Sequence, residues 1–204
     1  MERAGQGWWC CYCRVRAWSY LRYGLAAEEV WRHPHTHIGS KKVKVIYPGT
    51  FDPVTEGHLD IIRRAAGIFE ELEVAVVDRS SKSMVFDTET RVNLVGSAVK
   101  EKGIAGAITV CSFDGLLIDY MHKQGFLLFI RGLRANSDFE YEFQMQLMNR
   151  RLAPEITGIY MMPSEHNMYL SSTVVKEVAK FGGSLDTLVT ASVKKALKDH
   201  YRRN

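Results

Sequence analysis

The chain has 204 residues, a formal net charge of +4, and a composition that is 46% hydrophobic and 25% charged. This length suffices for one domain with its own hydrophobic core plus an appendage. The small net charge gives no reason to expect a nucleic-acid binder, and no apolar run reaches the roughly 18–20 residues of a membrane span. We therefore expect a soluble globular protein that binds neither nucleic acid nor a membrane.

The first forty residues differ in composition from the rest. They hold all four tryptophans, three of the four cysteines and three of the seven histidines. Their spacing matches no usual zinc-ligand pattern, and Arg14 and Arg16 interrupt the only apolar stretch, which argues against a secretory signal. We predict an extension over residues 1–40, whether a leader, a mis-assigned start, a transit peptide or a disordered segment, and one domain over 41–204. Because no disulfide framework is evident, we expect a cytoplasmic protein.

From residue 41 onward, apolar strands alternate with amphipathic helical patterns. Strands are predicted over 43–47, 72–78, 107–112, 126–130 and 158–163, and helices over 57–70, 88–102 (with Thr88 as N-cap), 116–124, 138–152, 171–181 and 190–202. Strands separated by helices predict a parallel sheet with right-handed crossovers. The expected fold is a Rossmann-like α/β domain, a five-stranded parallel sheet with helices on both faces.

The segment YPGTFDPVTEGH (residues 47–58) is the most informative stretch. A strand runs into a predicted Pro/Gly turn that delivers Thr50, and His58 follows at the first turn of a helix. Helix N-termini expose unpaired N–H groups and the positive end of the helix dipole, so they bind phosphate readily. This pattern indicates phosphate chemistry.

Three more polar clusters follow predicted strand ends, where α/β sheets bind ligands. They are Lys82 in the loop after the second strand, Arg131 and Arg134 after the fourth, and the hydroxyl run Ser171, Ser172 and Thr173 at a helix start. Each alone is most simply a cap or a solvated charge, and Glu142 is most simply part of an acidic helix face. Their coincidence at one end of a sheet predicts a phosphate-rich ligand.

Several common motifs are missing from the sequence. It has no G-x-x-x-x-G-K-[ST] loop, no G-x-G-x-x-G after the first strand and no G-x-S-x-G. The candidate groups are donors and cations instead of nucleophiles. Such a set suits direct transfer between two bound phosphorylated substrates, catalysed by positioning and charge stabilisation.

Three segments, YPGTFDPVTEGH, IRGLRANSDFEYEFQM and SSTVVKEVA, together resemble bacterial phosphopantetheine adenylyltransferases of the T/H-x-G-H nucleotidyltransferase superfamily. The resemblance spans about residue 42 to the C-terminus. It implies adenylyl transfer from ATP to 4′-phosphopantetheine, giving dephospho-coenzyme A and pyrophosphate, with Mg²⁺ held mainly by the ATP phosphates. It also implies a homohexamer, with coenzyme A as a possible feedback inhibitor.

The same resemblance implies roles for individual residues. His58 would stabilise the transition state, Thr50 and Lys82 would orient the acceptor phosphate, and Arg131 and Leu117 would bind the pantetheine substrate. The positions implied to contact ATP are Thr50, Phe51, His58, Gly132, Leu133, Arg134, Glu142, Asn167, Met168, Tyr169, Leu170, Ser171, Ser172 and Thr173.

The chain departs from the family pattern at Ser83 and Met84, where another lysine and a proline are common, and at Asn167, where an aromatic residue is common. Two alternatives stay open. One is a related enzyme with another acceptor, such as nicotinamide mononucleotide or a polyol phosphate, although the IRGLR…DFEYE stretch argues against it. The other is a nucleotide-binding module without catalysis.

Overall fold

The computed structural model describes residues 43–78, 84–134 and 136–203; the predicted extension over 1–40 and the candidate Lys82 lie outside them. The elements are β1 (Lys44–Gly49), α2 (Glu56–Ile68), β2 (Glu71–Val77), α3 (Thr88–Glu101), β3 (Ala107–Phe113), α4 (Leu117–Gln124), β4 (Leu128–Gly132), α5 (Asn136–Leu152), β5 (Thr157–Met161), the 3₁₀ helix η2 (Glu165–Asn167), α6 (Ser172–Lys180) and α7 (Ala191–Arg203). Every predicted strand and helix is present, and η2 is an addition.

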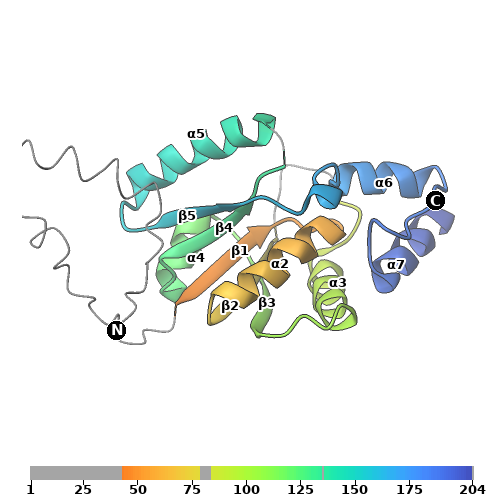
Figure 1. The fold of residues 1–204 in the computed structure, drawn as a ribbon, viewed down its shortest axis with the longest axis horizontal. Helices are drawn as coiled ribbons and strands as arrows, with labels where there is room; N and C mark the ends of the chain where they lie inside the picture. The colour runs from red at the N-terminus through yellow and green to blue at the C-terminus, as the bar shows by residue number, and fades with distance from the viewer. Residues whose placement is uncertain (1–42, 79–83, 135, 204) are drawn as a thin grey trace, which may run out of the picture. The chain divides into compact units, whose positions relative to one another are not determined.

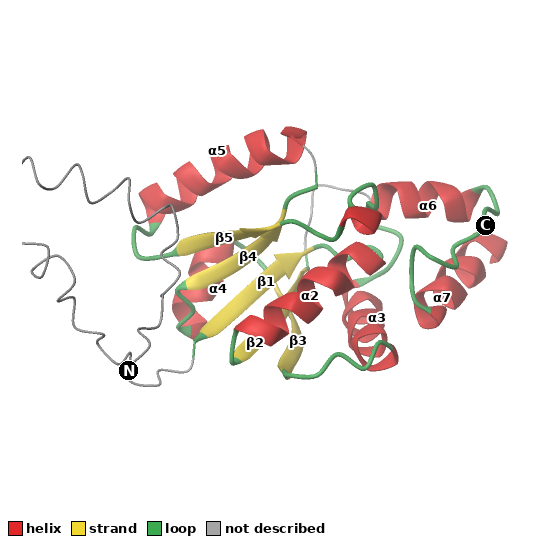
Figure 2. Ribbon diagram, viewed as in Figure 1, coloured by secondary structure: helices red, strands yellow, loops and turns green. Residues whose placement is uncertain are grey.

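The five strands form one parallel sheet in the order β3-β2-β1-β4-β5. Figures 1 and 2 show the strands running side by side, with β1 at the centre. The chain adds β2 and β3 in turn on one side of β1, and then crosses back to add β4 and β5 on the other side. The carboxyl ends of β1 and β4 therefore meet at the topological switch point, where sheets of this kind bind ligands.

Helices cover both faces of the sheet, as Figure 1 shows for α2 and α4. Neighbouring β1 residues point to opposite faces, so Val45 joins the core packed by α2, α3, α6 and α7, while Ile46 joins the core packed by α4. Both side chains are fully buried. The predicted Rossmann-like architecture is confirmed.

Strand β1 is longer than predicted. Pro48 and Gly49, expected to form a turn, pair with Ala75 and Val76 of β2. A proline inside a strand lacks the N–H that would complete the ladder, but its carbonyl is used, because Arg131 donates to it. The turn comes later, after Phe51, whose φ of 46° lies in the left-handed region.

Strand β4 begins two residues later than predicted. Helix α4 ends at Gly125, whose φ of 73° allows a left-handed cap, and the N–H of Phe126 then donates to the carbonyl of Met121. The cap takes the first residues of the predicted strand, so Arg131 lies within β4 and pairs with Tyr160 of β5. The prediction that Arg131 follows the strand was wrong.

Helix α3 begins at Thr88, but Thr88 is not its cap. The carboxylate of Asp87 accepts the N–H of Thr90 at 2.8 Å, so Asp87 is the N-cap residue. The hydroxyl of Thr88 instead donates to Asp78 and accepts from Arg91. The predicted cap was wrong by one residue.

Candidate active site

A cavity of about 620 Å³ opens at the switch point, within the size range of small-molecule sites. Its walls come from the carboxyl ends of β1 and β4, the first turn of α2, α5 and the start of α6. Most of the sequence-predicted residues line it: Thr50, Phe51, His58, Arg131, Gly132, Arg134, Glu142, Leu170, Ser171, Ser172 and Thr173. The structure thus brings three of the four predicted clusters together; Lys82, the fourth, lies outside the described residues.

His58 is held by the start of its own helix. Thr55 is the N-cap of α2, and its backbone N–H donates to His58 Nδ1 at 3.1 Å. The Thr55 hydroxyl lies 2.9 Å from the same nitrogen. A backbone N–H can only donate, so Nδ1 accepts, and we assign the proton of the neutral ring to Nε2. The ring therefore keeps an N–H donor for a ligand in the cavity.

The electrostatic surroundings keep this imidazole neutral. Removal from water and, to a smaller extent, the charge of Arg134 together lower the pKa of His58 from 6.5 to about 4. Phe51 packs edge-on against the ring, with centroids 5.1 Å apart. At neutral pH His58 can donate a hydrogen bond from Nε2 but carries no charge of its own.

Arg131 and Glu142 form a half-buried pair on the cavity wall. Arg131 Nε donates to both carboxylate oxygens, at 3.0 and 2.9 Å, and Nη2 donates to Oε1 at 2.6 Å. Burial alone would lower the pKa of Arg131, but the hydrogen bonds and charge of Glu142 outweigh it, so this pKa lies above its ordinary value. Glu142 therefore orients a permanent cation and is more than the solvated helix face that the sequence suggested.

The hydroxyl run at the start of α6 is partly used within the protein. Ser171 is the N-cap of α6 and accepts the N–H of Val174 at 3.1 Å. Ser172 donates to the carbonyl of Pro53 at 2.8 Å, and Arg134 donates to the carbonyl of Leu170 at 2.8 Å. The Ser172 bond fastens the start of α6 to the loop after β1, and the Arg134 bond fastens it to the segment after β4, so the predicted anion cradle also closes the cavity wall.

A buried carboxylate supports the loop after β1. Asp52 is 2% exposed, and it accepts the backbone N–H groups of Val85 and Phe86 at 2.9 and 3.0 Å. Lys176 of α6 donates to the same carboxylate at 3.1 Å. Asp52 thus connects three segments beneath the cavity, and this pairing is what allows a carboxylate to be buried.

The structure also reveals lining residues that the sequence reasoning missed. Tyr47 is 4% exposed, and burial raises the pKa of its phenol. Tyr141 of α5 lines the same cavity. Tyr47 shares its sheet face with Val45, so the period-two alternation of β1 could have identified it. Packing is close at Gly132, where a Cβ would lie 2.6 Å from Ile61 Cδ1 and the end of that side chain would have to shift.

Some predicted residues lie outside the cavity lining. Leu117 packs against the core on the α4 face. Leu133 is absent from the lining, and so is the segment that holds Asn167, Met168 and Tyr169, of which the last two are exposed. Asn167 belongs to η2, where its side chain donates to Ser164.

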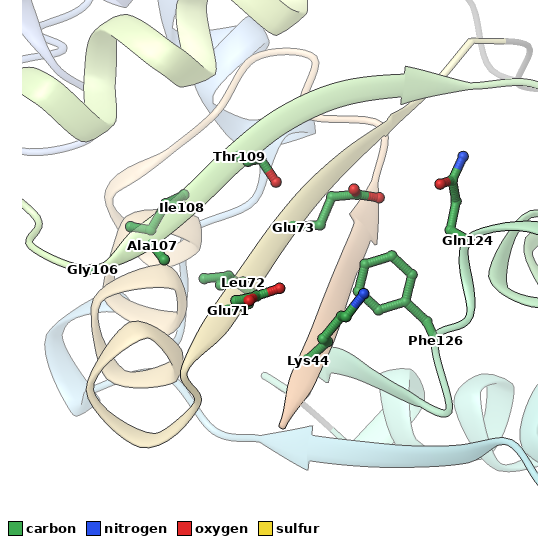
Figure 3. A pocket seen from close by; sticks show the side chains of 10 residues that line it. All are labelled: Lys44, Glu71, Leu72, Glu73, Gly106, Ala107, Ile108, Thr109, Gln124 and Phe126. Carbon is green, nitrogen blue, oxygen red and sulfur yellow. The ribbon is translucent and has the colours of Figure 1, made fainter. Parts of the chain in front are cut away.

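A second cavity, of about 470 Å³, opens at the amino ends of β1, β2 and β3, the opposite rim of the sheet. Figure 3 shows Glu71 and Glu73 among its labelled side chains, together with Lys44 and Phe126. Two carboxylates beside one lysine would repel a phosphate, whereas the switch-point cavity carries two arginines. Phosphate chemistry therefore belongs at the switch point.

Among the described residues, no cluster of three or more His, Cys, Asp or Glu side chains could hold a metal ion. None of the described helices combines the length and apolarity needed to cross a bilayer.

Comparisons with known proteins agree with this geometry. Residues 46–178 match the family model described as Cytidylyltransferase-like. A crystal structure from Vibrio parahaemolyticus, named as a nicotinate-nucleotide adenylyltransferase, superimposes with a TM-score of 0.60 at 19% identity, covering 80% of this chain and 97% of its own. At that identity, the likeness shows the fold alone. Fold, site and family model together define a nucleotidyltransferase of the cytidylyltransferase-like class.

Curated relatives narrow the class. A phosphopantetheine adenylyltransferase from Legionella pneumophila (strain Paris) is 47% identical over 79% of this chain and 94% of its own length. The enzyme of the same name from Clostridium kluyveri is 49% identical, over 74% of this chain and 90% of its own length. The one from Methylacidiphilum infernorum is 44% identical, over 76% of this chain and 89% of its own length. The chain belongs to the phosphopantetheine adenylyltransferase family.

Proposed function

We propose that this protein transfers the adenylyl group of ATP to 4′-phosphopantetheine, which yields dephospho-coenzyme A and pyrophosphate. The observation that carries the proposal is the cavity in which His58 Nε2–H, Arg131 and Arg134 meet at the switch point. The names of relatives 44–49% identical support the choice of substrates.

The reaction is a direct in-line displacement. An oxygen of the phosphopantetheine phosphate attacks the α-phosphorus of ATP, one P–O bond forms, and the bond to the β-phosphate oxygen breaks as pyrophosphate leaves. A phosphate monoester is already ionised near neutral pH, so the attacking oxygen needs no general base. Catalysis then consists of positioning and charge stabilisation.

His58 takes the central role in this mechanism. Its Nε2–H would donate to a non-bridging oxygen of the α-phosphate, where negative charge builds up in the transition state. A neutral donor suits this task, because it needs no proton transfer during the reaction. Its orientation comes from Thr55, which occupies Nδ1.

The remaining roles are those that the family resemblance implies. Thr50 and Lys82 would orient the acceptor phosphate. Arg131, aligned by Glu142, would bind the pantetheine substrate, with Leu117 near its arm. The lining groups that would hold ATP are Thr50, Phe51, His58, Gly132, Arg134, Glu142, Leu170, Ser171, Ser172 and Thr173. Leu133, Asn167, Met168 and Tyr169 would join them only if their segments approach the nucleotide on binding.

Mg²⁺ is proposed as the cofactor, held mainly by phosphate oxygens of ATP. Glu142 is the one carboxylate among the described residues that line the cavity, and Arg131 already engages it. This donor set fits an ion that arrives with its nucleotide. The ion would neutralise charge on the triphosphate, while the protein side chains orient it.

A homo-oligomer, a hexamer by family resemblance, is proposed as the assembly. Helix α5 supports this, because it exposes many large apolar side chains. They are Phe139, Tyr141, Phe143, Met145, Leu147, Met148 and Leu152. Coenzyme A as a feedback inhibitor and a cytoplasmic location complete the proposal.

A turnover assay tests the function. The full-length chain is incubated with ATP, Mg²⁺ and 4′-phosphopantetheine, and pyrophosphate release is followed. Parallel reactions contain nicotinamide mononucleotide or glycerol 3-phosphate as acceptor. We expect release with phosphopantetheine only. Release with another acceptor alone would identify a related transferase, and ATP binding without release would identify a binding module.

A further inference from the structure

Arg91 of α3 is the bulkiest of the fully buried side chains, with 1% of its surface exposed. A buried guanidinium is costly unless its charge and its donors are satisfied. Burial lowers its pKa, while the carboxylates of Asp52, Asp78 and Asp87 favour the charged form. This role could not be predicted from the sequence, because an arginine in an amphipathic helix is normally solvated.

All five N–H donors of the guanidinium are engaged. Nη1 donates to the carbonyls of Thr50 at 2.7 Å and Val77 at 2.8 Å. Nη2 donates to the carbonyl of Asp78 at 3.2 Å and to the hydroxyl of Thr88 at 2.8 Å. Nε donates to the carbonyl of Phe86 at 3.2 Å.

Two of these five acceptors belong to residues that line the cavity. Thr50 directly follows β1, and both Thr50 and Val77, the last residue of β2, line the cavity. Carbonyl groups at the carboxyl ends of neighbouring strands have no further strand residues to bond, and their oxygens would repel one another. One planar cation between them satisfies both, and it fixes the distance between the two strand ends.

We infer that Arg91 is a positioning residue for the transfer reaction: it holds the backbone of Thr50 against the end of β2, so that the Thr50 side chain meets the acceptor phosphate in the attacking geometry. The inference rests on the proposed function for its catalytic consequence. Its structural content, that Arg91 orders the end of β1, does not depend on which acceptor is used.

The test compares Arg91→Met and Arg91→Lys with a matched control. Met removes the charge and all five donors, whereas Lys keeps the charge but lacks the planar fork that reaches several carbonyls at once. The control is Val95→Ala, one turn along the same helix, which removes buried methyl groups without touching the strand ends. All proteins are assayed well below their melting temperatures.

We expect kcat/KM for 4′-phosphopantetheine to fall about 100-fold in Arg91→Met, since a displacement of about 1 Å at a reacting group lowers the rate by about that factor. In Arg91→Lys, which keeps the charge, we expect a smaller fall of about tenfold. Val95→Ala should lower the melting temperature but leave both kinetic constants within about twofold. If Arg91 only stabilised the fold, the Arg91 variants and Val95→Ala would show the same pattern, a lower melting temperature with nearly unchanged kinetic constants.

Hydrogen–deuterium exchange on the ligand-free proteins gives a readout that needs no turnover. Peptides covering residues 48–54 should exchange faster in both Arg91 variants and at the wild-type rate in Val95→Ala. If wild type releases no pyrophosphate, the proposed function fails, and the exchange data still decide on Arg91. If Arg91→Met does not fold, Thr88→Ala removes one acceptor and should show a smaller change of the same kind. Wild-type kinetics and exchange in folded Arg91 variants would overturn the inference.

Discussion

His58 shows how one residue can serve phosphate chemistry without carrying a charge. Its Nδ1 is occupied by Thr55 and its ring is withdrawn from water, so the neutral Nε2–H form persists at neutral pH. A fixed dipole in a partly water-excluded site needs no reorganisation when charge develops on the α-phosphate. The positive charges near the ligand come from arginines instead.

Replacing His58 by Ala should lower kcat about 100-fold or more, because one transition-state donor is typically worth that much. Pyrophosphate release measures kcat, and circular dichroism checks that the fold is intact. His166→Ala serves as control, because that histidine is exposed and outside the cavity lining. Turnover near the wild-type level in His58→Ala would refute the role.

The pH dependence follows from the lowered pKa of His58. As pH falls below 6.5, this histidine takes up a proton in the unfolded chain but stays neutral in the folded protein until about pH 4. Protonation of the unfolded state therefore costs stability between those two values, and the contribution is constant above pH 6.5. NMR of the ring nitrogens should show His58 neutral with Nε2 protonated at pH 5.5. A titration midpoint near 6.5 would contradict it.

At the scale of elements, the β1–α2 loop is held by neighbours far away in sequence. Asp52 bonds the backbone before α3 and Lys176 of α6. Asp52→Ala leaves that lysine and two N–H groups without their carboxylate, so we expect a loss of about 3–5 kcal/mol in the free energy of unfolding. Urea unfolding measures it. Asp186→Ala, at an exposed carboxylate, should cost much less stability; an equal loss in both would argue against the support role.

The elements could be predicted because strand and helix periodicities are local properties. Their ends could not, because competing hydrogen bonds decide them: the Gly125 cap shortened β4, and Asp87 displaced Thr88 as N-cap. Site residues in short motifs, such as Thr50 and His58, were predictable. Arg91 and Asp52 were not, since their partners lie 41 and 124 residues away.

At the scale of the whole molecule, the exposed apolar side chains of α5 predict self-association. Phe143→Asp places a charge among apolar side chains, and it should shift the protein toward smaller assemblies in light scattering coupled to gel filtration. Phe181→Asp is the control, because Phe181 is also an exposed phenylalanine, more exposed than Phe143, but lies at the end of α6. A monomeric wild type, or unchanged mass in Phe143→Asp, would contradict the proposal.

The predicted N-terminal extension over residues 1–40 should be dispensable for activity. The described cavity is built from residues between 47 and 173, so a protein that begins at Lys41 should keep the kcat and KM of the full chain within about twofold. Pyrophosphate release by both proteins at equal concentration decides it. A large loss of activity in the shorter protein would assign a role to the N-terminal extension.

The first turn of α2 does not stand alone: the N–H of Glu56 donates to the carbonyl of Leu188 at 2.9 Å, and the Glu56 carboxylate pairs with Lys102 at 2.8 Å. Helix α2, which carries His58, is thereby hydrogen-bonded to the C-terminal part of the chain at Leu188. A premature stop codon between Thr173 and Leu188 would spare every side chain that lines the cavity, yet it would remove the carbonyl that holds Glu56. A truncation near the C-terminus should therefore lower the activity of a cavity whose lining residues are all still present.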